Sequence, residues 1–273
     1  MSIPTFITAE PFVIGRQLML GENEAHHIRV RRLDIGTRVG LLDGQGTRGS
    51  GTLVRLGKRN ATVEVDEVHT EPAPRPVHLI LPIADKERML WLAEKATELG
   101  VSSWRPVQFR RSRSVSARGE GTMFNQKVSA RMGGALEQSG SAWMPVIYPE
   151  ATVDRAVAAA PDGIRIILDG GGEPLARVAA LLPSVAPVPT SADDDAMLPP
   201  VIIAVGPEGG IEPDELERFT EAGFHTVSIG STILRFETAA IAALGIVRSL
   251  TGGPSRSAGG APAQGADSPS NTR

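Results

Sequence analysis

Four short, continuous apolar segments in the second part of the chain constrain its fold more than any other feature. They are 77-VHLILPI-83, 164-IRIILD-169, 201-VIIAV-205 and 226-TVSIG-230. Strands that are covered on both faces have this character, because neither side of the strand meets water. Segments with helical periodicity lie between them, at about residues 86–100, 122–139, 150–160, 213–222 and 236–250. The alternation predicts an α/β domain with a mainly parallel sheet.

The chain before residue 70 has a different pattern. The segments 37-TRVGLLD-43, 48-RGSGTLVRL-56 and 61-ATVEVDEV-68 alternate or nearly alternate between apolar and polar residues, and turn residues separate them. This spacing predicts a small β-barrel. The stretch 71-EPAPRPV-77 contains three prolines and is expected to link the two parts of the chain.

These patterns predict two domains and two irregular segments. We expect a β-barrel domain over residues 1–72 and an α/β domain over residues 73–250. Residues 184–200 are rich in Pro, Ser and Asp and are expected to form a flexible surface insertion in the second domain. The tail, residues 251–273, is almost free of large apolar residues and is expected to be disordered.

Composition excludes several kinds of site. The chain has 273 residues, no cysteine and a formal net charge of -3, so disulfides, thiolate metal sites and cysteine nucleophiles are excluded. No apolar run approaches the roughly 20 residues of a membrane span, and the N-terminal segment lacks a signal-peptide pattern, so a cytoplasmic location is expected. His26 and His27 are adjacent on an expected strand, where they would point to opposite faces, and no metal site is predicted.

Basic residues cluster in two runs despite the negative net charge. Residues 29–59 contain eight Lys or Arg side chains and two acids, and 105-RPVQFRRSRSVSAR-118 contains five arginines and no acid. A genome that favours arginine codons explains the excess of Arg over Lys, but it does not explain the clustering. The two runs predict surfaces that bind phosphate backbones, for which the guanidinium group is well suited.

A glycine-rich loop, 206-GPEGG-210, follows the third apolar segment and precedes a helix. Its glycines allow the backbone to approach a ligand closely. No G-K-[ST] motif follows, and the helix begins with Pro213, Asp214 and Glu215, whose carboxylates occupy the electropositive helix end. A triphosphate would be repelled there, so the loop favours a neutral or cationic ligand. A nucleotide-dependent enzyme that binds phosphate at this loop is the alternative, and saturable ATP binding would support it.

A second loop, after the fourth apolar segment, has the same organisation. Gly230 begins a short polar turn, and an apolar helix follows, with Arg235 and Glu237 at its start. If the two strands are adjacent and parallel, both loops lie at the carboxyl edge of the sheet, where open α/β sheets bind ligands. Arg235 and Glu237 are therefore candidates for the site, although a capping carboxylate paired with an arginine would use the same residue types.

Longer strings of the sequence resemble a known family. They are 26-HHIRVRRLDIGTRVGLLDGQG-46, 91-WLAEKATELGVSSWRPVQFRRS-112, 137-EQSG-140, Gly206 to Glu215, and 233-ILRFETAAIAAL-244. Together they are similar to the RsmE family of SPOUT-class RNA methyltransferases, over about residues 4–250. The resemblance implies a PUA-like β-barrel that helps to bind RNA, an α/β domain with a deep trefoil knot, an obligate homodimer, and S-adenosylmethionine as the cofactor. It also implies methylation at N3 of the uridine called 1498 in the 16S ribosomal RNA of the small subunit.

The resemblance and the two loops together give the candidate site residues. Uracil N3 carries a proton that must leave before methylation, so the site needs a base or a group that stabilises the anion. Arg235 is expected to stabilise that anion or to bind phosphate, and Glu208 or Glu237 to accept the proton or to orient Arg235. The expected cofactor contacts are Val205, Gly206, Glu208, Gly209, Gly210, Ile229, Gly230, Ile233 and Leu234. The expected RNA contacts are Arg29, Arg31, Arg32, Arg110, Arg111 and Arg113.

Two places depart from the family pattern. Ser231-Thr232 stands where the family usually has Pro-Arg, and Ser141 stands where Arg is common. Two positive charges that are expected near the RNA are therefore absent. A non-catalytic RNA-binding or ribosome-assembly protein of the same fold is the alternative, and cofactor binding would argue against it.

Overall fold

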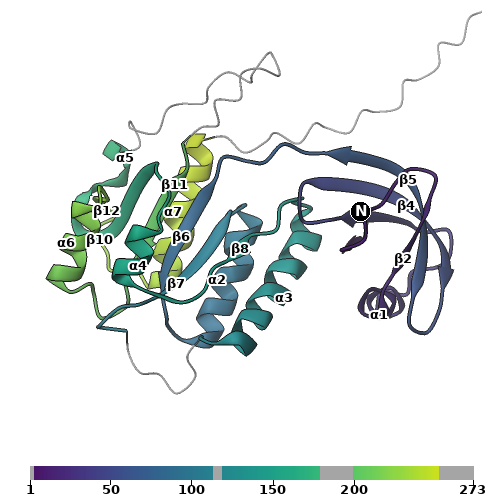
Figure 1. The fold of residues 1–273 in the computed structure, drawn as a ribbon, viewed down its shortest axis with the longest axis horizontal. Coiled ribbons are helices and arrows are strands. Elements are labelled where there is room, and N and C mark those ends of the chain that lie inside the picture. The colour runs from purple at the N-terminus through teal and green to yellow at the C-terminus, as the bar shows by residue number, and fades with distance from the viewer. Residues whose placement is uncertain (1–2, 113–118, 179–198, 252–273) are drawn as a thin grey trace, which may run out of the picture.

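The computed structural model describes residues 3–112, 119–178 and 199–251. Two β-sheets lie toward opposite ends of the molecule, and the chain passes from one to the other between strands β5 and β6 (Figure 1). Arg113, most of the expected insertion at 184–200 and nearly all of the tail after residue 250 lie outside the described residues. No helix in these ranges is long and apolar enough to cross a membrane.

The first sheet contains strands β1 (Thr5–Ile7), β2 (Gln17–Leu20), β3 (Arg38–Leu42), β4 (Thr47–Leu56) and β5 (Ala61–Thr70). Their order is β1-β3-β4-β5-β2, and every pair is antiparallel except β1 with β3. Helix α1 (Glu22–Val30) covers the core of this part through Ala25 and Ile28, which pack with strand residues that include Phe6 and Leu41. The strands and the helix thus enclose one apolar core.

The structure corrects the assignment of His26 and His27. Both lie in α1 and not on a strand. A helix of nine residues carries little periodic signal, and its start has no side-chain cap. The two acids in its first turn and the buried pair three positions apart, Ala25 and Ile28, are the signals that indicate it.

The second sheet is parallel throughout. Its strands are β6 (Val77–Pro82), β7 (Ser103–Gln108), β8 (Val146–Ile147), β9 (Ala151–Thr152), β10 (Ile164–Pro174), β11 (Val201–Val205) and β12 (His225–Ser228). The helices of this part are α2 (Lys86–Glu98), α3 (Thr122–Ser139), α4 (Val153–Ala158), α5 (Leu175–Val178), α6 (Pro213–Glu221) and α7 (Phe236–Thr251). The strand order is β12-β10-β11-β6-β7-β8, and β9 also pairs with β7. The prediction of an α/β fold with a mainly parallel sheet is confirmed.

Strand β11 shows why the apolar segments are continuous. Val201, Ile203 and Val205 belong to a core that α2, α3 and α7 complete on one face of the sheet. Ile202 and Ala204 belong to a second core that α4 and α6 complete on the other face. Because helices cover both faces, every residue of this strand is buried.

Several strands differ from the sequence prediction, among them β10 and β7. Strand β10 continues to Pro174, well past the predicted end at residue 169, and its register against β12 shifts between Leu168 and Glu173. The glycines between these residues permit the irregular stretch. Strand β7 was not expected, because 103-SWRPVQ-108 contains a proline and polar residues, yet it pairs in parallel with β6.

Helix α3 joins the two parts of the molecule. Leu42 of β3 packs with Leu136 of α3 and with Ala142 just beyond it in a small apolar cluster. Glu137 Oε1 accepts a hydrogen bond from the backbone N–H of Ile7 at 3.3 Å. Burial raises the pKa of the Glu137 carboxyl. The first sheet is thus fixed against the end of α3 by both apolar and polar contacts.

Candidate active site

A cavity of about 360 Å³ opens at the carboxyl ends of β10, β11 and β12. The end of β10, the loop after β11, the loop after β12 and the first turn of α7 form its walls. The lining residues are Leu168, Asp169, Gly170, Val205, Gly206, Pro207, Glu208, Gly210, Ile211, Val227, Ser228, Ile229, Gly230, Ser231, Thr232, Ile233, Leu234, Phe236 and Ala239. The carboxyl edge of a parallel sheet is where open α/β folds bind ligands.

The chemistry of the cavity matches an adenosyl ligand better than a triphosphate. Its walls are mainly apolar side chains and glycine backbone, with the hydroxyl side chains of Ser228, Ser231 and Thr232, and its charged lining residues are the acids Asp169 and Glu208. No Lys, Arg or His belongs to the lining among the described residues. Gly206 has no room for a side chain, since a Cβ there would lie 2.4 Å from Ile211 Cγ1. The close packing of glycine backbone against Ile211 therefore shapes this wall of the cavity. The residues therefore fit S-adenosylmethionine, which carries a sulfonium cation and no phosphate.

Most of the predicted cofactor residues meet in this cavity. Gly209 is the exception, because it faces Arg111, whose carbonyl oxygen would lie 3.0 Å from a Cβ at that position. The sequence reasoning missed the residues from β10, Leu168, Asp169 and Gly170. They lie at or just after the end of the predicted apolar strand 164–169, so the rule that ligands bind at carboxyl strand ends could have indicated them.

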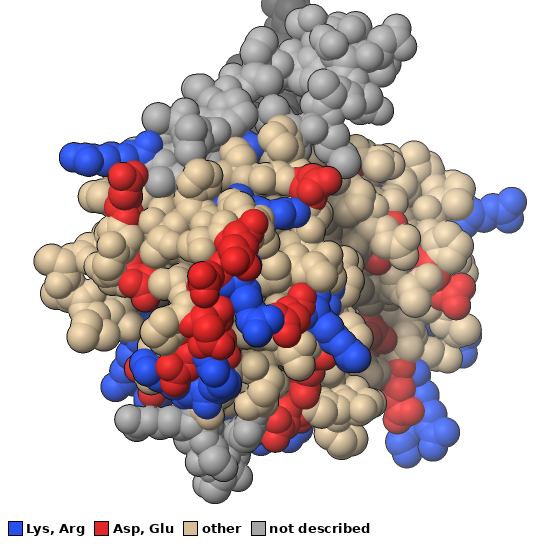
Figure 2. Space-filling view, turned by 60° about the vertical axis from the view of Figure 1, so that its left-hand side comes forward, with Lys and Arg blue, Asp and Glu red and all other residues tan. Residues whose placement is uncertain are grey.

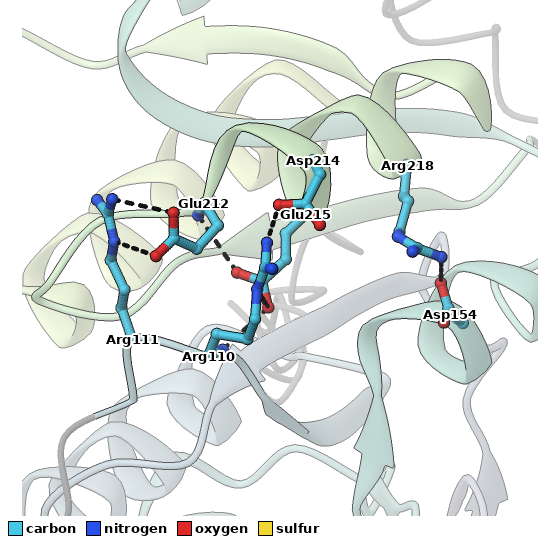
Figure 3. A network of polar contacts seen from close by, with 7 residues as sticks. All are labelled: Arg110, Arg111, Asp154, Glu212, Asp214, Glu215 and Arg218. Carbon is cyan, nitrogen blue, oxygen red and sulfur yellow. Dashed lines mark hydrogen bonds and ion pairs between the residues drawn. The ribbon is translucent and has the colours of Figure 1, made fainter.

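The acidic start of α6 is held by arginines from the loop after β7 (Figure 3). Arg111 pairs with Glu212 through two hydrogen bonds of 2.7 and 3.0 Å. Arg110 forms an ion pair with Asp214, and its backbone N–H donates to the buried Glu215 at 2.9 Å. The basic run and the acidic helix start are therefore partners within one chain. On the face shown in Figure 2, basic and acidic side chains are accordingly interspersed.

The three predicted catalytic residues do not form one cluster. Arg235 is exposed, does not line the cavity, and has no ion pair or side-chain hydrogen bond within the described ranges. Glu208 lines the cavity and forms an ion pair with Arg88 of α2. Glu237 is buried in the first turn of α7, with Oε1 3.9 Å from Arg88 Nε. Arg88 was not predicted, and no signal in the sequence places it opposite these carboxylates.

The predicted RNA contacts Arg29, Arg31 and Arg32 lie at the end of α1. Arg29 Nη1 donates to the carbonyl oxygens of Gly57 and Lys58 at 3.0 and 2.5 Å, so it also fixes the turn between β4 and β5. Arg32 has φ 54°, a left-handed conformation that favours glycine. Its N–H donates to Arg29 O, and the next N–H donates from Leu33 to Ile28 O. These are the two bonds of a Schellman motif, with arginine at the position where glycine is usual.

Replacing Arg32 by glycine is expected to raise the free energy of unfolding by about 0.5 kcal/mol, because relief of the left-handed strain outweighs the extra entropy that glycine loses on folding. If Arg32 contacts RNA, the same change weakens RNA binding. Thermal unfolding and RNA binding measured on one preparation test both effects. Arg32→Asn is the matched control, since asparagine also tolerates this conformation but lacks the charge. Unchanged RNA affinity in both variants would remove Arg32 from the RNA contacts.

The fold and the cavity define a two-part α/β protein, with a ligand cavity at the carboxyl edge of a parallel sheet and a small β-domain that carries basic residues. Residues 71–248 match the model of the RNA methyltransferase domain, and residues 20–66 match that of the RNA methyltransferase PUA domain. The chain belongs to this family of RNA methyltransferases. The expected fold, a SPOUT-type domain preceded by a PUA-like domain, is confirmed by these matches.

Relatives and solved structures agree with the family. The ribosomal RNA small subunit methyltransferase E of Mycobacterium bovis is 29% identical over 241 residues, covering 85% of each chain. The protein of the same name from Bacillus subtilis is 25% identical, covering 83% of this chain and 87% of the relative. The crystal structure of the Neisseria gonorrhoeae enzyme bound to S-adenosylmethionine is similar with a TM-score of 0.78 and 27% identity, covering 92% of this chain and 98% of that chain.

The described residues contain no group of three or more His, Asp or Glu side chains that could hold a metal ion. Arg113, one of the six predicted RNA contacts, lies outside the described residues.

Proposed function

We propose that the protein transfers a methyl group from S-adenosylmethionine to N3 of a specific uridine in the 16S ribosomal RNA of the small subunit. The observation that carries the proposal is the cavity at the ends of β10, β11 and β12, which has glycine backbone, apolar walls and two acids but no basic lining residue. The likeness to a methyltransferase structure with this cofactor bound supports the same assignment. When bound, the cofactor supplies an electrophilic methyl group on a sulfonium.

The residues at the edge of the cavity suggest how the uracil is activated. Glu208 lines the cavity and its side chain is 39% exposed, so it can reach both solvent and a bound base. Glu237 is buried beside Arg88 and is less accessible to a substrate. We therefore assign proton acceptance at N3 to Glu208. Arg235, exposed just before α7, is free to approach the anion or a flanking phosphate.

In this proposal, the two parts of the chain have different functions. Residues 1–72 bind RNA through Arg29, Arg31 and Arg32 at the end of α1, and residues 73–250 bind the cofactor and carry out the transfer. Arg110 and Arg111 would contribute to RNA binding from the second part. The protein would act as a homodimer in the cytoplasm, where ribosomal subunits are assembled.

Methyl transfer from labelled S-adenosylmethionine tests the function directly. The substrates are small ribosomal subunits and free 16S RNA from cells that lack the protein, and the modified nucleotide is mapped. Label at N3 of a single uridine is the expected result. Cofactor binding without label in either substrate would favour a non-catalytic RNA-binding protein. Ser231 and Thr232, which depart from the family pattern and line the cavity, are the residues that would account for that result.

A further inference from the structure

Arg88 lies between the two loops that enclose the cavity. It is in the first turn of α2, where Asp85 caps the helix by accepting hydrogen bonds from the N–H groups of Glu87 and Arg88, both at 3.1 Å. Its guanidinium forms an ion pair with Glu208, in the loop after β11. The same group lies 3.9 Å from Glu237, which follows the loop after β12. One side chain on a capped helix thus contacts the loop after β11 and the first turn of α7.

Glu237 makes this contact different from an ordinary surface ion pair. The residue is 8% exposed, and its Oε2 is buried without a hydrogen-bond partner. Burying a carboxylate is costly unless a counter-charge and hydrogen bonds compensate for the lost water. Arg88 is the cation that reaches Glu237 within the described residues. Without Arg88, the start of α7 would contain an uncompensated buried charge.

The position of Glu237 connects this charge to the cavity. Phe236, the residue before it, lines the cavity, as does Ala239. Glu208, the other partner of Arg88, also lines it. A shift of α7 to expose the Glu237 carboxylate would therefore move the wall that α7 forms. Loss of the Glu208 ion pair would remove a contact that holds the other wall, the loop after β11. Within the described residues, no other ion pair joins the segments that form these two walls.

We propose that Arg88 is a positioning residue, which holds Glu208 and the start of α7 in the arrangement that binds the methyl donor and presents Glu208 to the substrate. This inference rests on the proposed function, and it assigns a role to a residue that contacts the cavity only through its two partners. Arg88 acts by providing a counter-charge for the buried Glu237 carboxylate and by keeping α7 in place.

The experiment compares Arg88→Ala, Arg88→Lys and the double variant Arg88→Ala/Glu237→Gln with the wild type. Arg131→Ala is the matched control, because Arg131 also pairs with a glutamate, Glu94 at 3.1 Å, but lies on α3 away from the cavity. S-adenosylmethionine affinity is measured by calorimetry, together with thermal unfolding and with kcat and KM for the RNA.

Arg88→Ala is expected to weaken cofactor binding about tenfold, a change of about 1.4 kcal/mol. Arg88→Ala/Glu237→Gln is expected to recover part of the affinity, because glutamine removes the buried carboxylate that Arg88→Ala leaves without a counter-charge. Arg88→Lys should retain most of the affinity but lower kcat, because lysine does not provide the guanidinium fork that reaches both carboxylates.

Two results would overturn the proposal. One is cofactor affinity in Arg88→Ala within twofold of that of Arg131→Ala. The other is a loss that follows the unfolding temperature and is not relieved by Glu237→Gln, which would indicate a structural role only. Failure of the wild type to bind S-adenosylmethionine would instead overturn the proposed function itself.

Discussion

Arg235→Ala is expected to lower the rate of methyl transfer by about 100- to 1000-fold, the cost of removing one preorganised group that stabilises a developing anion. The side chain lies outside the cavity lining, so the affinity for S-adenosylmethionine should change by no more than about threefold. The reduction should appear in kcat and in kcat/KM alike if Arg235 acts on the anion, and mainly in KM if it binds only a flanking phosphate. Steady-state kinetics on 16S RNA, together with cofactor calorimetry, separate these cases.

Arg155→Ala is the matched control for this change. Arg155 is an exposed arginine on α4 and is not part of the cavity. Its replacement should leave both the rate and the cofactor affinity as they are in the wild type. Full turnover with normal cofactor affinity in Arg235→Ala would exclude Arg235 from the chemistry.

Gly206→Ala should weaken S-adenosylmethionine binding roughly 10- to 100-fold. A Cβ at this position would lie 2.4 Å from Ile211 Cγ1 and 2.8 Å from Ile211 Cδ1. Isoleucine is branched at Cβ and can yield only by leaving its preferred rotamer or by moving its backbone. Overpacking of this kind costs about 1–3 kcal/mol, and each 1.4 kcal/mol is a tenfold change in affinity. Because Ile211 lines the cavity, the displacement alters the site itself.

The control for Gly206→Ala is Gly245→Ala, in α7. A Cβ at Gly245 meets no atom within 4 Å, so this change should leave cofactor affinity intact and stabilise the helix slightly. Calorimetry of both variants, with thermal unfolding to confirm that each is folded, gives the comparison. Equal cofactor affinities in the two variants would show that the cavity does not bind the cofactor at the Gly206 loop.

The fold could be predicted where hydrophobic pattern and element length agree. Helix α3 occupies the predicted residues 122–139, and β11 the predicted residues 201–205, because one has sustained periodicity and the other is buried on both faces. Helix α1 was not predicted, since nine residues with two buried positions give only a weak pattern. The extension of β10 through its glycines depends on pairing with β12, which is a property of the sheet and not of the local sequence.

The candidate site, like the fold, could be predicted only in part from the sequence. The two glycine loops were predictable, because their position after apolar strands places them at the carboxyl edge of a parallel sheet. The ion-pair partners of the charged residues in these loops could not be predicted. Arg88 and Glu208, for example, are 120 positions apart, and only the folded chain brings them together. For the same reason, the sequence predicted only that the acids at the start of α6 repel a phosphate. In the structure these acids also bind Arg110 and Arg111.

The pairing of Arg110 and Arg111 with the start of α6 affects how this surface discriminates among polyanions. An isolated guanidinium attracts any phosphate and releases counterions when it binds. An arginine that already has a carboxylate partner must exchange that partner for the phosphate, and the exchange is favourable only when the new geometry is at least as good. The arginines and carboxylates of such a surface cancel each other's electrostatic potential locally. The surface would therefore distinguish an RNA by the spacing of its phosphates and not by their number.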